Sequence, residues 1–501
     1  MQKKIPGILT KKNLSLLCLG VLLLSLFPML YVSRYNHPTG DDIYYGLDAH
    51  MIWESTHSLP RTIAGAWQGV ARNYNTWQGT YSAMLLMHLQ PSVFSEHCYF
   101  LPPFLIIGFM LWGSWYLLRQ ISRYVIPFDT YEQLGIWSVL MLLSLQWVFS
   151  PGEAFYWYNG GMYYTGFYGL TLLMFGLLCK YANTGKKGIL ALLLFVELLI
   201  GGGNYLTLLW SMIVLILTTA LQWLRRRPGR IGLTCAALFQ IACFAVSAAA
   251  PGNALRSATT TQLSAFKAIW FSLRQGIVYL SIWLNGWWIL GAMVLLFFML
   301  PAIRKMSFRF PYPFLAVIFL YGMFCALSCP TFYAQSNAGP ARAVNVCYYG
   351  FILTSYMALF YLAGWGYHKV RGAACHKSSR EGDNSPLKFA YCSLLFLVLI
   401  TQLCIGTVDG TLRQAASVRA LQDIVSGTAA AYDREYRERI LLLETSAEPD
   451  IVLMPYQYQP QTVYVGDYGG DSSQVSNQAL AAWYGHRSVI VDYSSLEHGS
   501  Y

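Results

Sequence analysis

The sequence predicts an all-α polytopic membrane protein with about eleven transmembrane helices, a long first outer loop of surface helices and a small C-terminal α/β module. Three observations support this class. The 501 residues are 55% hydrophobic and only 11% charged, and their mean hydropathy of +0.41 lies outside the range of ordinary soluble domains. Apolar runs recur at the length that a bilayer core requires. Basic residues gather in alternate loops between these runs, as the positive-inside rule describes.

The apolar runs define the expected spans. The first run follows a lysine-rich N-terminal segment and has no small-residue cleavage site after it, so we expect a retained first helix. Each run has roughly 17 to 22 residues, about the length that crosses the hydrocarbon core as a helix. The expected spans lie near residues 14–31, 99–118, 132–150, 165–182, 188–202, 206–223, 231–250, 281–301, 312–329, 346–365 and 388–407.

Placing these spans alternately predicts which loops face the cytoplasm. Every loop on the expected cytoplasmic side carries Lys or Arg, so the assignments by length and by charge agree. We therefore expect a cytoplasmic N-terminus and an extracytoplasmic C-terminal tail. The formal net charge of +11 is explained by these loops, which excludes nucleic acid as a partner. The basic loop residues are Arg119, Arg123, Lys180, Lys186, Lys187, Arg225, Arg226, Arg227, Arg230, Arg304, Lys305, Arg309, Lys369, Arg371, Lys377 and Arg380.

The outward segments complete the predicted architecture. Residues 1–407 form the transmembrane domain, and its first outer loop, about 32–98, has weakly amphipathic stretches that predict helices along the membrane surface. Residues 408–501 form the outer tail, in which helical and strand patterns alternate. The predicted tail elements are a helix over 413–442, strands over 449–455, 461–467 and 488–493, and a helix over 477–485.

Several classes of site lack their motifs. The sequence has no Walker loop, no G-x-G-x-x-G that opens a helix after a strand, and no G-x-S-x-G nucleophile elbow. Most of the 11 cysteines lie in or beside apolar runs, no pair has zinc spacing, and the tail contains none. We therefore expect neither a metal cluster nor a disulfide framework.

The stretch TGDDIYYG places two carboxylates, Asp41 and Asp42, soon after the first span. One interpretation is a helix start, where a first-turn acid is favourable. A single cap does not need two acids, because neighbouring helical residues point about 100° apart. The functional interpretation is that one aspartate caps and the other is a general base, which takes a proton from an attacking hydroxyl.

Aromatic and amide residues in other outward segments are candidate substrate contacts. GEAFYWYNGG carries Glu153 and Trp157, and NYNTWQGTYS carries Trp77 and Gln78. Their rings could stack on sugar rings, whereas the alternative is an ordinary aromatic belt at the membrane interface. Three further charged or amide residues are expected on the same side, namely Arg72, Asn204 and Asn253.

Two arginines are candidates for phosphate binding. Arg256, in PGNALR, opens the outward segment 251–280, and Arg342, in AGPARAV, precedes the tenth span. A planar guanidinium can bind two phosphate oxygens at once. The alternative for each is contact with ordinary lipid phosphate at the headgroup level.

These features together resemble the GT-C class of membrane glycosyltransferases. TGDDIYYG, GEAFYWYNGG, GGGN, APGNALR and NQALAAWYGHRSVIV are similar, in order and spacing, to an uncharacterised bacterial multi-spanning family grouped with that class. The resemblance implies an enzyme of the bacterial cytoplasmic membrane. It would transfer a sugar from a polyprenyl-phosphate donor to an extracytoplasmic glycan or glycolipid.

The resemblance also implies roles for individual residues. Asp41 or Asp42 would activate the acceptor hydroxyl, with Asp42 preferred, while Arg256 and Arg342 would stabilise the departing lipid phosphate. Direct displacement would invert the anomeric centre. Relatives often carry an acid after the asparagine of GGGN, where this chain has Tyr205, so we assign no metal. A divalent cation stays an open alternative, and no other cofactor is expected.

Two other function classes remain open. A transporter or flippase for a lipid-linked saccharide would place charges in the membrane, or pair broken helices in two matching halves. Glu197 and the glycine break 201–203 are single features of that kind, and the chain shows no repeat. The third class is a non-catalytic scaffold whose tail binds cell-wall polymer.

Overall fold

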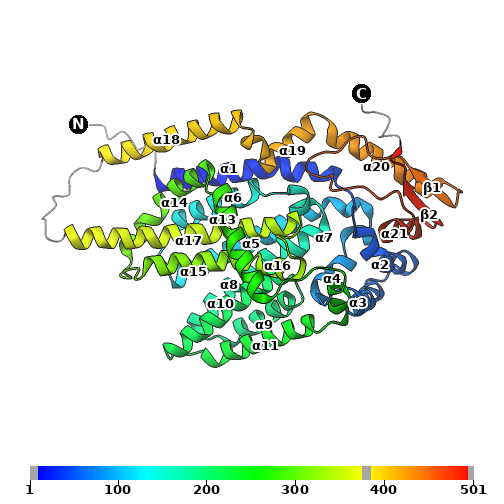
Figure 1. Cartoon of the computed structure of the whole chain (residues 1–501). Coiled ribbons are helices and arrows are strands. Elements are labelled where there is room, and N and C mark those ends of the chain that lie inside the picture. The colour runs from blue at the N-terminus through cyan, green and yellow to red at the C-terminus, as the bar shows by residue number, and fades with distance from the viewer. Residues whose placement is uncertain (1–9, 375–384, 495–501) are drawn as a thin grey trace.

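A computed structural model describes residues 10–374 and 385–494, which fold into a helical bundle with a small mixed tail (Figure 1). The helices of its first half are α1 (Lys11–Tyr31), η1 (Val32–Tyr35), α2 (Asp42–Thr56), α3 (Leu59–Thr76), α4 (Tyr81–His88), η2 (Pro91–Val93), η3 (Glu96–Phe100), α5 (Pro102–Tyr124), α6 (Thr130–Gln146), η4 (Gly152–Tyr156), α7 (Tyr158–Gly161), η5 (Met162–Gly166), α8 (Phe167–Thr184), α9 (Lys187–Gly201), α10 (Tyr205–Leu224) and α11 (Arg230–Ala248). The elements that follow are α12 (Pro251–Ser257), α13 (Ala265–Trp283), α14 (Gly286–Lys305), α15 (Pro313–Ala326), α16 (Cys329–Gln335), α17 (Ala341–Ala374), α18 (Ser385–Val408), η6 (Thr411–Gln414), α19 (Ala416–Val425), α20 (Thr428–Thr445), β1 (Asp450–Leu453), α21 (Val475–Tyr484) and β2 (Ser488–Val491).

Within the described residues, seven helical segments are long and apolar enough to cross a membrane. The predicted all-α, multi-span architecture is therefore confirmed. The number eleven stays a prediction, because α6 and α9 have only 17 and 15 residues and the pair α15 and α16 is bent by 40°. The seven segments are Lys11–Tyr35, Pro102–Tyr124, Tyr158–Thr184, Tyr205–Leu224, Arg230–Ala248, Gly286–Lys305 and Ala341–Val370.

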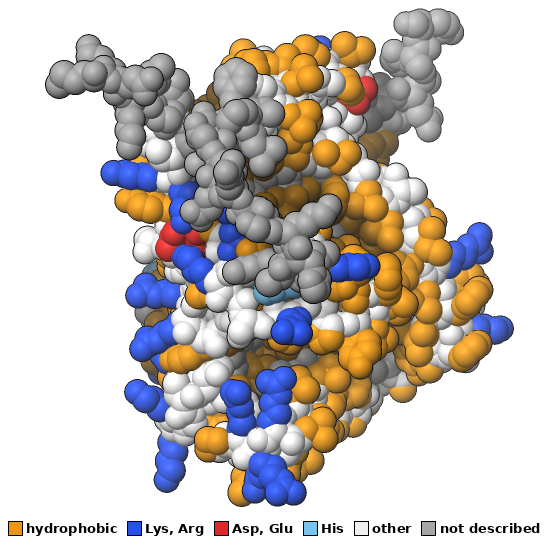
Figure 2. Space-filling view, turned by 90° about the vertical axis from the view of Figure 1, so that its left-hand side faces the viewer, with side chains coloured by type: hydrophobic (Ala, Val, Ile, Leu, Met, Phe, Trp, Pro, Cys, Tyr) orange, Lys and Arg blue, Asp and Glu red, His pale blue; other side chains and the backbone are white. Residues whose placement is uncertain are grey.

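One end of the bundle is basic. Lys11, at the start of α1, lies 2.5 Å from Asp129 and 2.7 Å from Glu132 at the start of α6, so these two helices start at the same end. Helix α14, which packs on α6, ends with Arg304 and Lys305 in its last turn. Figure 2 shows Lys and Arg gathered on this face with few acids. This is the distribution that the positive-inside rule gives a cytoplasmic face.

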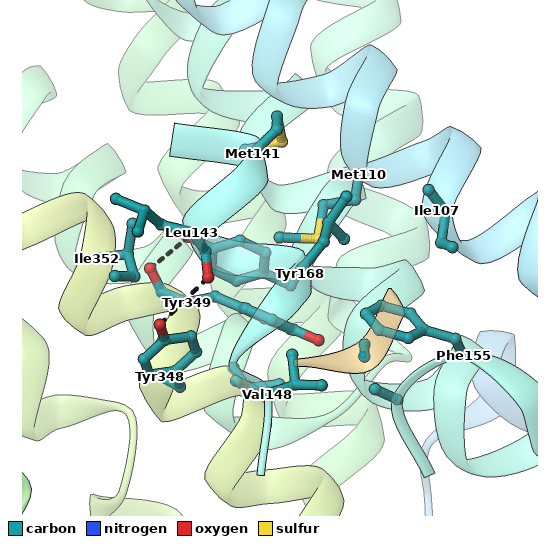
Figure 3. Close-up of a cluster of buried hydrophobic side chains, with 14 of the residues drawn as sticks. Ile107, Met110, Met141, Leu143, Val148, Phe155, Tyr168, Tyr348, Tyr349 and Ile352 are labelled. Carbon is teal, nitrogen blue, oxygen red and sulfur yellow. Dashed lines mark hydrogen bonds between the residues drawn. The ribbon is translucent and has the colours of Figure 1, made fainter. Parts of the chain in front are cut away.

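Close packing of helices fixes the middle of the bundle. A Cβ on Gly113 of α5 would lie 2.1 Å from the Gly169 carbonyl oxygen of α8, so the two backbones meet where only glycine fits. Figure 3 shows a cluster of buried side chains that includes Met110 of α5 and Tyr168 of α8. Tyr348 donates to the Leu143 carbonyl at 3.1 Å, and Tyr168 donates to the Tyr349 carbonyl at 3.2 Å. These bonds satisfy buried hydroxyls and join α17 to α6 and α8.

The segment 251–283, most of which was expected to face outward, contains two helices that the apolar pattern did not predict. α12 packs on α3 of the first outer loop, and α13 packs on α15 and α16. Figure 1 shows α13 crossing the long helices of the bundle. Lys267 and Arg274 interrupt its apolar pattern, which hides a helix from a search for uncharged runs. The first outer loop does form short helices, as expected.

The tail is partly as predicted. β1 and β2 pair in parallel from Asp450↔Ser488 to Leu453↔Val491, and α21 forms where a helix was expected. The helix predicted over 413–442 is instead divided at Gly427, whose φ of 76° ends its first part. The strand predicted over 461–467 is wrong. The backbone amides of Gln461 and Thr462 donate to the Asp423 carboxylate at 3.0 and 2.9 Å, in place of a strand partner.

The tail packs on the first outer loop. The indole of Trp483 in α21 stacks on His50 of α2, with ring centroids 3.7 Å apart. The hydroxyl of Thr39 donates to the Gly466 carbonyl at 3.2 Å, and Tyr436 donates to Glu96 at 3.2 Å. The tail therefore covers the start of α2, where the paired aspartates lie.

Candidate functional site

The turn before α2 sets the directions of the two aspartates. Gly40 has a φ of 60°, which favours glycine, and a Cβ there would contact the Trp157 ring at 3.4 Å. Asp41 is the N-cap residue of α2, but its side chain makes no capping bond. Asp42 instead accepts from the Thr39 backbone amide at 3.2 Å. Neither carboxylate therefore caps the amides of α2 in the expected way.

Asp42 is an enclosed structural acceptor. Its side chain is 0% exposed, and it accepts from the Asn159 amide at 3.2 Å and from the Tyr99 hydroxyl. Tyr99 in turn accepts from the Tyr158 amide at 3.0 Å. Since Tyr158 and Asn159 begin α7, Asp42 satisfies one free amide of that helix directly and supports the other through Tyr99. Burial, and then the charge of Asp41, raise the pKa of Asp42 to about 8.

Asp41 is the more accessible carboxylate of the pair. It is half-buried and accepts from Asn159 Nδ2 at 3.0 Å. Burial raises the pKa of Asp41, against the opposing effects of the Asn159 hydrogen bond and the Arg342 charge. It therefore lies in a partly desolvated place with a guanidinium nearby, which suits a general base.

The segment between α6 and α8 presents aromatic and acidic groups through two π-helical turns. η4 and η5 flank the short α7, and such turns redirect side chains and often occur at functional sites. Glu153 of η4 accepts from the Arg342 backbone amide at 3.2 Å and from its Nη1 at 3.0 Å. The guanidinium carbon of Arg342 lies 4.9 Å from the Trp157 ring centroid. Arg342 is thus held between a carboxylate and an aromatic face.

Two buried polar atoms beside Asp41 lack a hydrogen-bond partner within residues 10–374 and 385–494. They are the indole Nε1 of Trp157 and the Oδ1 of Asn159. Buried polar groups are ordinarily satisfied by protein or water. One unused donor and one unused acceptor therefore lie close to Asp41 and to the Gly40 turn before it.

A second arginine lies on α12. Arg256 Nη1 donates to Gln78 Oε1 at 2.5 Å, and its guanidinium carbon lies 4.8 Å from the Trp77 ring centroid. Asn253 fixes this arrangement, because its Oδ1 accepts from the Gly79 amide at 3.3 Å and its Nδ2 donates to the Ser247 carbonyl at 2.8 Å. Four sequence-predicted residues are thus brought together here.

Tyrosines connect the two arginines with Asp41. Burial and the charge of Asp41 raise the pKa of Tyr45, while Arg256 opposes the shift. The Tyr45 hydroxyl is therefore within electrostatic reach of both. The charge of Arg342 acts on Asp41 itself, and the Arg342 guanidinium carbon lies 5.8 Å from the Tyr164 ring centroid. The carboxylate and the two guanidinium groups consequently border one region.

Two predicted site residues, Arg72 and Asn204, have structural partners instead. Arg72 pairs with Asp48 at 2.6 Å on the surface. Asn204 caps α10 by accepting from the Thr207 amide at 3.0 Å, and it donates to the Tyr163 carbonyl at 2.6 Å. Sequence reasoning did not single out Asn159, although it lies within GEAFYWYNGG. Its contacts with Asp41 and Asp42 depend on folding across more than a hundred residues.

The donor set does not fit a resident divalent cation. Among the described residues, no group of three or more His, Cys, Asp or Glu side chains could hold a metal ion. Glu153 is already paired with Arg342, and Asp41 accepts from Asn159.

Comparison of the chain with protein-family models and with curated proteins finds no match in either. The resemblance to the GT-C class therefore remains an expectation from its motifs.

Proposed function

We propose that this protein is a membrane glycosyltransferase that moves a sugar from a polyprenyl-phosphate donor to a hydroxyl of an extracytoplasmic glycan or glycolipid. The observation that supports it best is that Trp157 lies against both the Gly40 turn before Asp41 and the Arg342 guanidinium, while Tyr45 is within electrostatic reach of Asp41 and Arg256. A carboxylate can accept the proton of the acceptor hydroxyl, and guanidinium groups can neutralise phosphate oxygens. The donor requires no nucleotide site.

The reaction is a direct displacement. Asp41 takes the hydroxyl proton while the acceptor oxygen forms a bond to the anomeric carbon, and the bond from that carbon to the phosphate oxygen breaks. The polyprenyl phosphate leaves with the bonding electrons, and Arg342 and Arg256 stabilise its charge. Attack opposite the leaving group inverts the anomeric centre. We propose Asp41 as the base, in place of the Asp42 first preferred, because Asp42 is enclosed and committed to α7.

Sugar recognition in this proposal uses the groups around the same region. Trp157 and Trp77 offer ring faces, and the unused Trp157 Nε1 and Asn159 Oδ1 offer one donor and one acceptor to sugar hydroxyls. The basic face at the other end of the bundle (Figure 2) supports an extracytoplasmic site, a cytoplasmic N-terminus and an outer tail.

Arginine substitutions test the proposal. We expect Arg342→Gln and Arg256→Gln each to lower transfer about 10²- to 10³-fold, the usual effect of removing one group that stabilises developing charge. The assay would use protein in nanodiscs, synthetic polyprenyl-phosphate donors with radiolabelled sugars, and isolated cell-envelope glycan as acceptor. Arg72→Gln is the matched control, because Arg72 pairs with Asp48 at the surface. If all three variants transfer at the wild-type rate, the proposed site is wrong.

A transporter or flippase is the second candidate. The observation that favours it is a buried acid without a partner, Glu197. This residue of the apolar helix α9 is 0% exposed, and neither carboxylate oxygen has a hydrogen-bond partner within the described chain. In a transferase this carboxyl has no role in the reaction and only destabilises the fold. We then expect Glu197→Gln to keep full transfer activity, and Glu197→Leu to raise the free energy of unfolding by about 1–3 kcal/mol, since an unpaired buried polar group is costly and leucine has none.

The measurement is thermal unfolding together with movement of a fluorescent lipid-linked sugar across proteoliposome membranes. Glu438→Gln, on the exposed side of α20, controls for the loss of one charge. Lipid movement by the wild type that Glu197→Gln abolishes would favour the transporter over the transferase.

A further inference from the structure

An open polar pocket of about 470 Å³ lies in the tail and shares no residue with the Asp41 region. It is bordered by η6, α19, the start of α20 and the loop around residues 459–461. Two arginines, four glutamines, one serine, one threonine and one aspartate line it. Its size is within the range of small-molecule sites, about 300–1,000 Å³, and its lining is rich in amides and hydroxyls.

The pocket carries two arginines that form no ion pair within the described residues. Neither Arg413 nor Arg419 pairs with a carboxylate among the ion pairs of residues 10–374 and 385–494. The aspartate of the pocket, Asp423, is committed elsewhere, because it accepts from the amides of Gln461 and Thr462 and from the Thr462 hydroxyl at 2.6 Å. Burial lowers the pKa of Arg419, and Asp423 opposes this shift. A half-buried guanidinium without a bonded anion is thus available to a ligand.

The surroundings hold the pocket at a fixed place. The small residues Ala416 and Ala420 are buried in the main core cluster, and the Ser417 amide donates to Gln146 Oε1 at 3.0 Å, at the end of α6. α19 also packs along α1. The pocket therefore sits on a rigid support, at the end of α6 that lies away from the basic face.

We propose that this pocket binds an anionic group that bears hydroxyls, with Arg413 and Arg419 on its phosphate or carboxylate and with Gln422, Gln461 and Ser426 on its hydroxyls. Guanidinium groups match phosphate and carboxylate geometry, and amides both donate to and accept from hydroxyls. The inference goes beyond the proposed function, because binding here requires no transfer of sugar. The anion could belong to a soluble glycan or to a lipid headgroup. Leu421 and Val425 of α19 are 51% and 78% exposed. They would contact the acyl chains of such a lipid.

Binding of simple probes tests this site. The first probe is glucose 1-phosphate, measured by calorimetry with the full chain in phosphatidylcholine nanodiscs and in the Arg256→Gln background, which weakens phosphate binding at the other site. We expect glucose 1-phosphate to bind at least ten times more tightly than glucose. Arg413→Gln and Arg419→Gln should each weaken it at least tenfold. Arg434→Gln, an exposed position of α20 outside the pocket lining, should leave it unchanged.

A second arm separates the two sources of the anion. Mixed nanodiscs that contain phosphatidylglycerol would be analysed by native mass spectrometry for lipid that stays bound. Retention that depends on Arg419, without binding of glucose 1-phosphate, identifies a lipid headgroup, whereas the reverse identifies a soluble glycan. If Arg413→Gln and Arg419→Gln bind the anions of both arms as tightly as the wild type does, the proposal is wrong. If Arg419→Gln lowers the unfolding temperature, Gln422→Ala tests the same pocket. Loss of transfer in Arg256→Gln with retained probe binding separates this site from the proposed catalytic one.

Discussion

Asp41→Asn is expected to lower the rate of sugar transfer about 10²- to 10⁴-fold, because the neutral amide cannot take the proton of the acceptor hydroxyl. The fold should survive, since the Asp41 side chain caps no helix and makes one side-chain bond, to Asn159. Burial raises the pKa of Asp41. The wild-type rate should therefore fall with decreasing pH at values above the ordinary aspartate pKa of about 3.9, because protonation removes the base.

The measurement is the pH profile of transfer in nanodiscs, with thermal unfolding recorded for each variant. Asp48→Asn is the matched control, because Asp48 lies on the same helix but pairs with Arg72 at the surface. The residual rate of Asp41→Asn should lose the acidic limb. Wild-type activity of Asp41→Asn at equal abundance would remove Asp41 from the mechanism. Loss of transfer in a well-folded Asp42→Asn variant alone would restore Asp42 as the base.

Asp42→Ala is expected to be the most destabilising single change at the site. It removes the acceptor for the amides of Thr39 and Asn159 and for the Tyr99 hydroxyl. Each buried donor left unpaired costs about 1–3 kcal/mol, so we expect the free energy of unfolding to fall by about 3 kcal/mol or more. Asp42→Asn keeps one acceptor oxygen and should lose less. Thermal unfolding in nanodiscs compares the two.

The pH dependence of stability gives an independent test of Asp42. Its pKa is raised to about 8 in the fold, by burial and by Asp41, against about 3.9 in an unfolded chain. The folded state therefore holds a proton that the unfolded state releases. Between about pH 4 and pH 8 this difference makes the unfolding free energy fall as pH rises. Asp42→Asn should lack that contribution. An unchanged slope in the variant would show that Asp42 does not titrate in this way.

Apolar run length was enough to predict most of the bundle, because a membrane-spanning helix is specified by its own composition. It missed α13, whose Lys267 and Arg274 break the run. In the tail, QTVYVGD has the alternation of a strand, but Asp423 binds the amides that a partner strand would need. Local pattern does not report such competition from a residue that lies 38 and 39 positions away.

The candidate site was likewise predicted only in part. Residue type and expected side of the membrane were sufficient to select Asp41, Arg256 and Arg342 as candidates. They did not separate Asp41 from Asp42, since the partners that enclose Asp42 are Tyr99 and Asn159, which are 57 and 117 residues away. The same criteria wrongly included Arg72, because its exposed ion pair with Asp48 cannot be recognised from the sequence.

The contact of the tail with the start of α2 has a consequence for biogenesis. Thr39 and His50 are made early in synthesis, yet their partners Gly466 and Trp483 are made more than four hundred residues later. The wall beside the paired aspartates is complete only after every intervening helix has been made and the tail has packed on α2. A nascent or prematurely terminated chain therefore carries the aspartates but not their finished surroundings. If the proposed function holds, partly made copies would therefore lack the complete site and would not consume the lipid-linked donor.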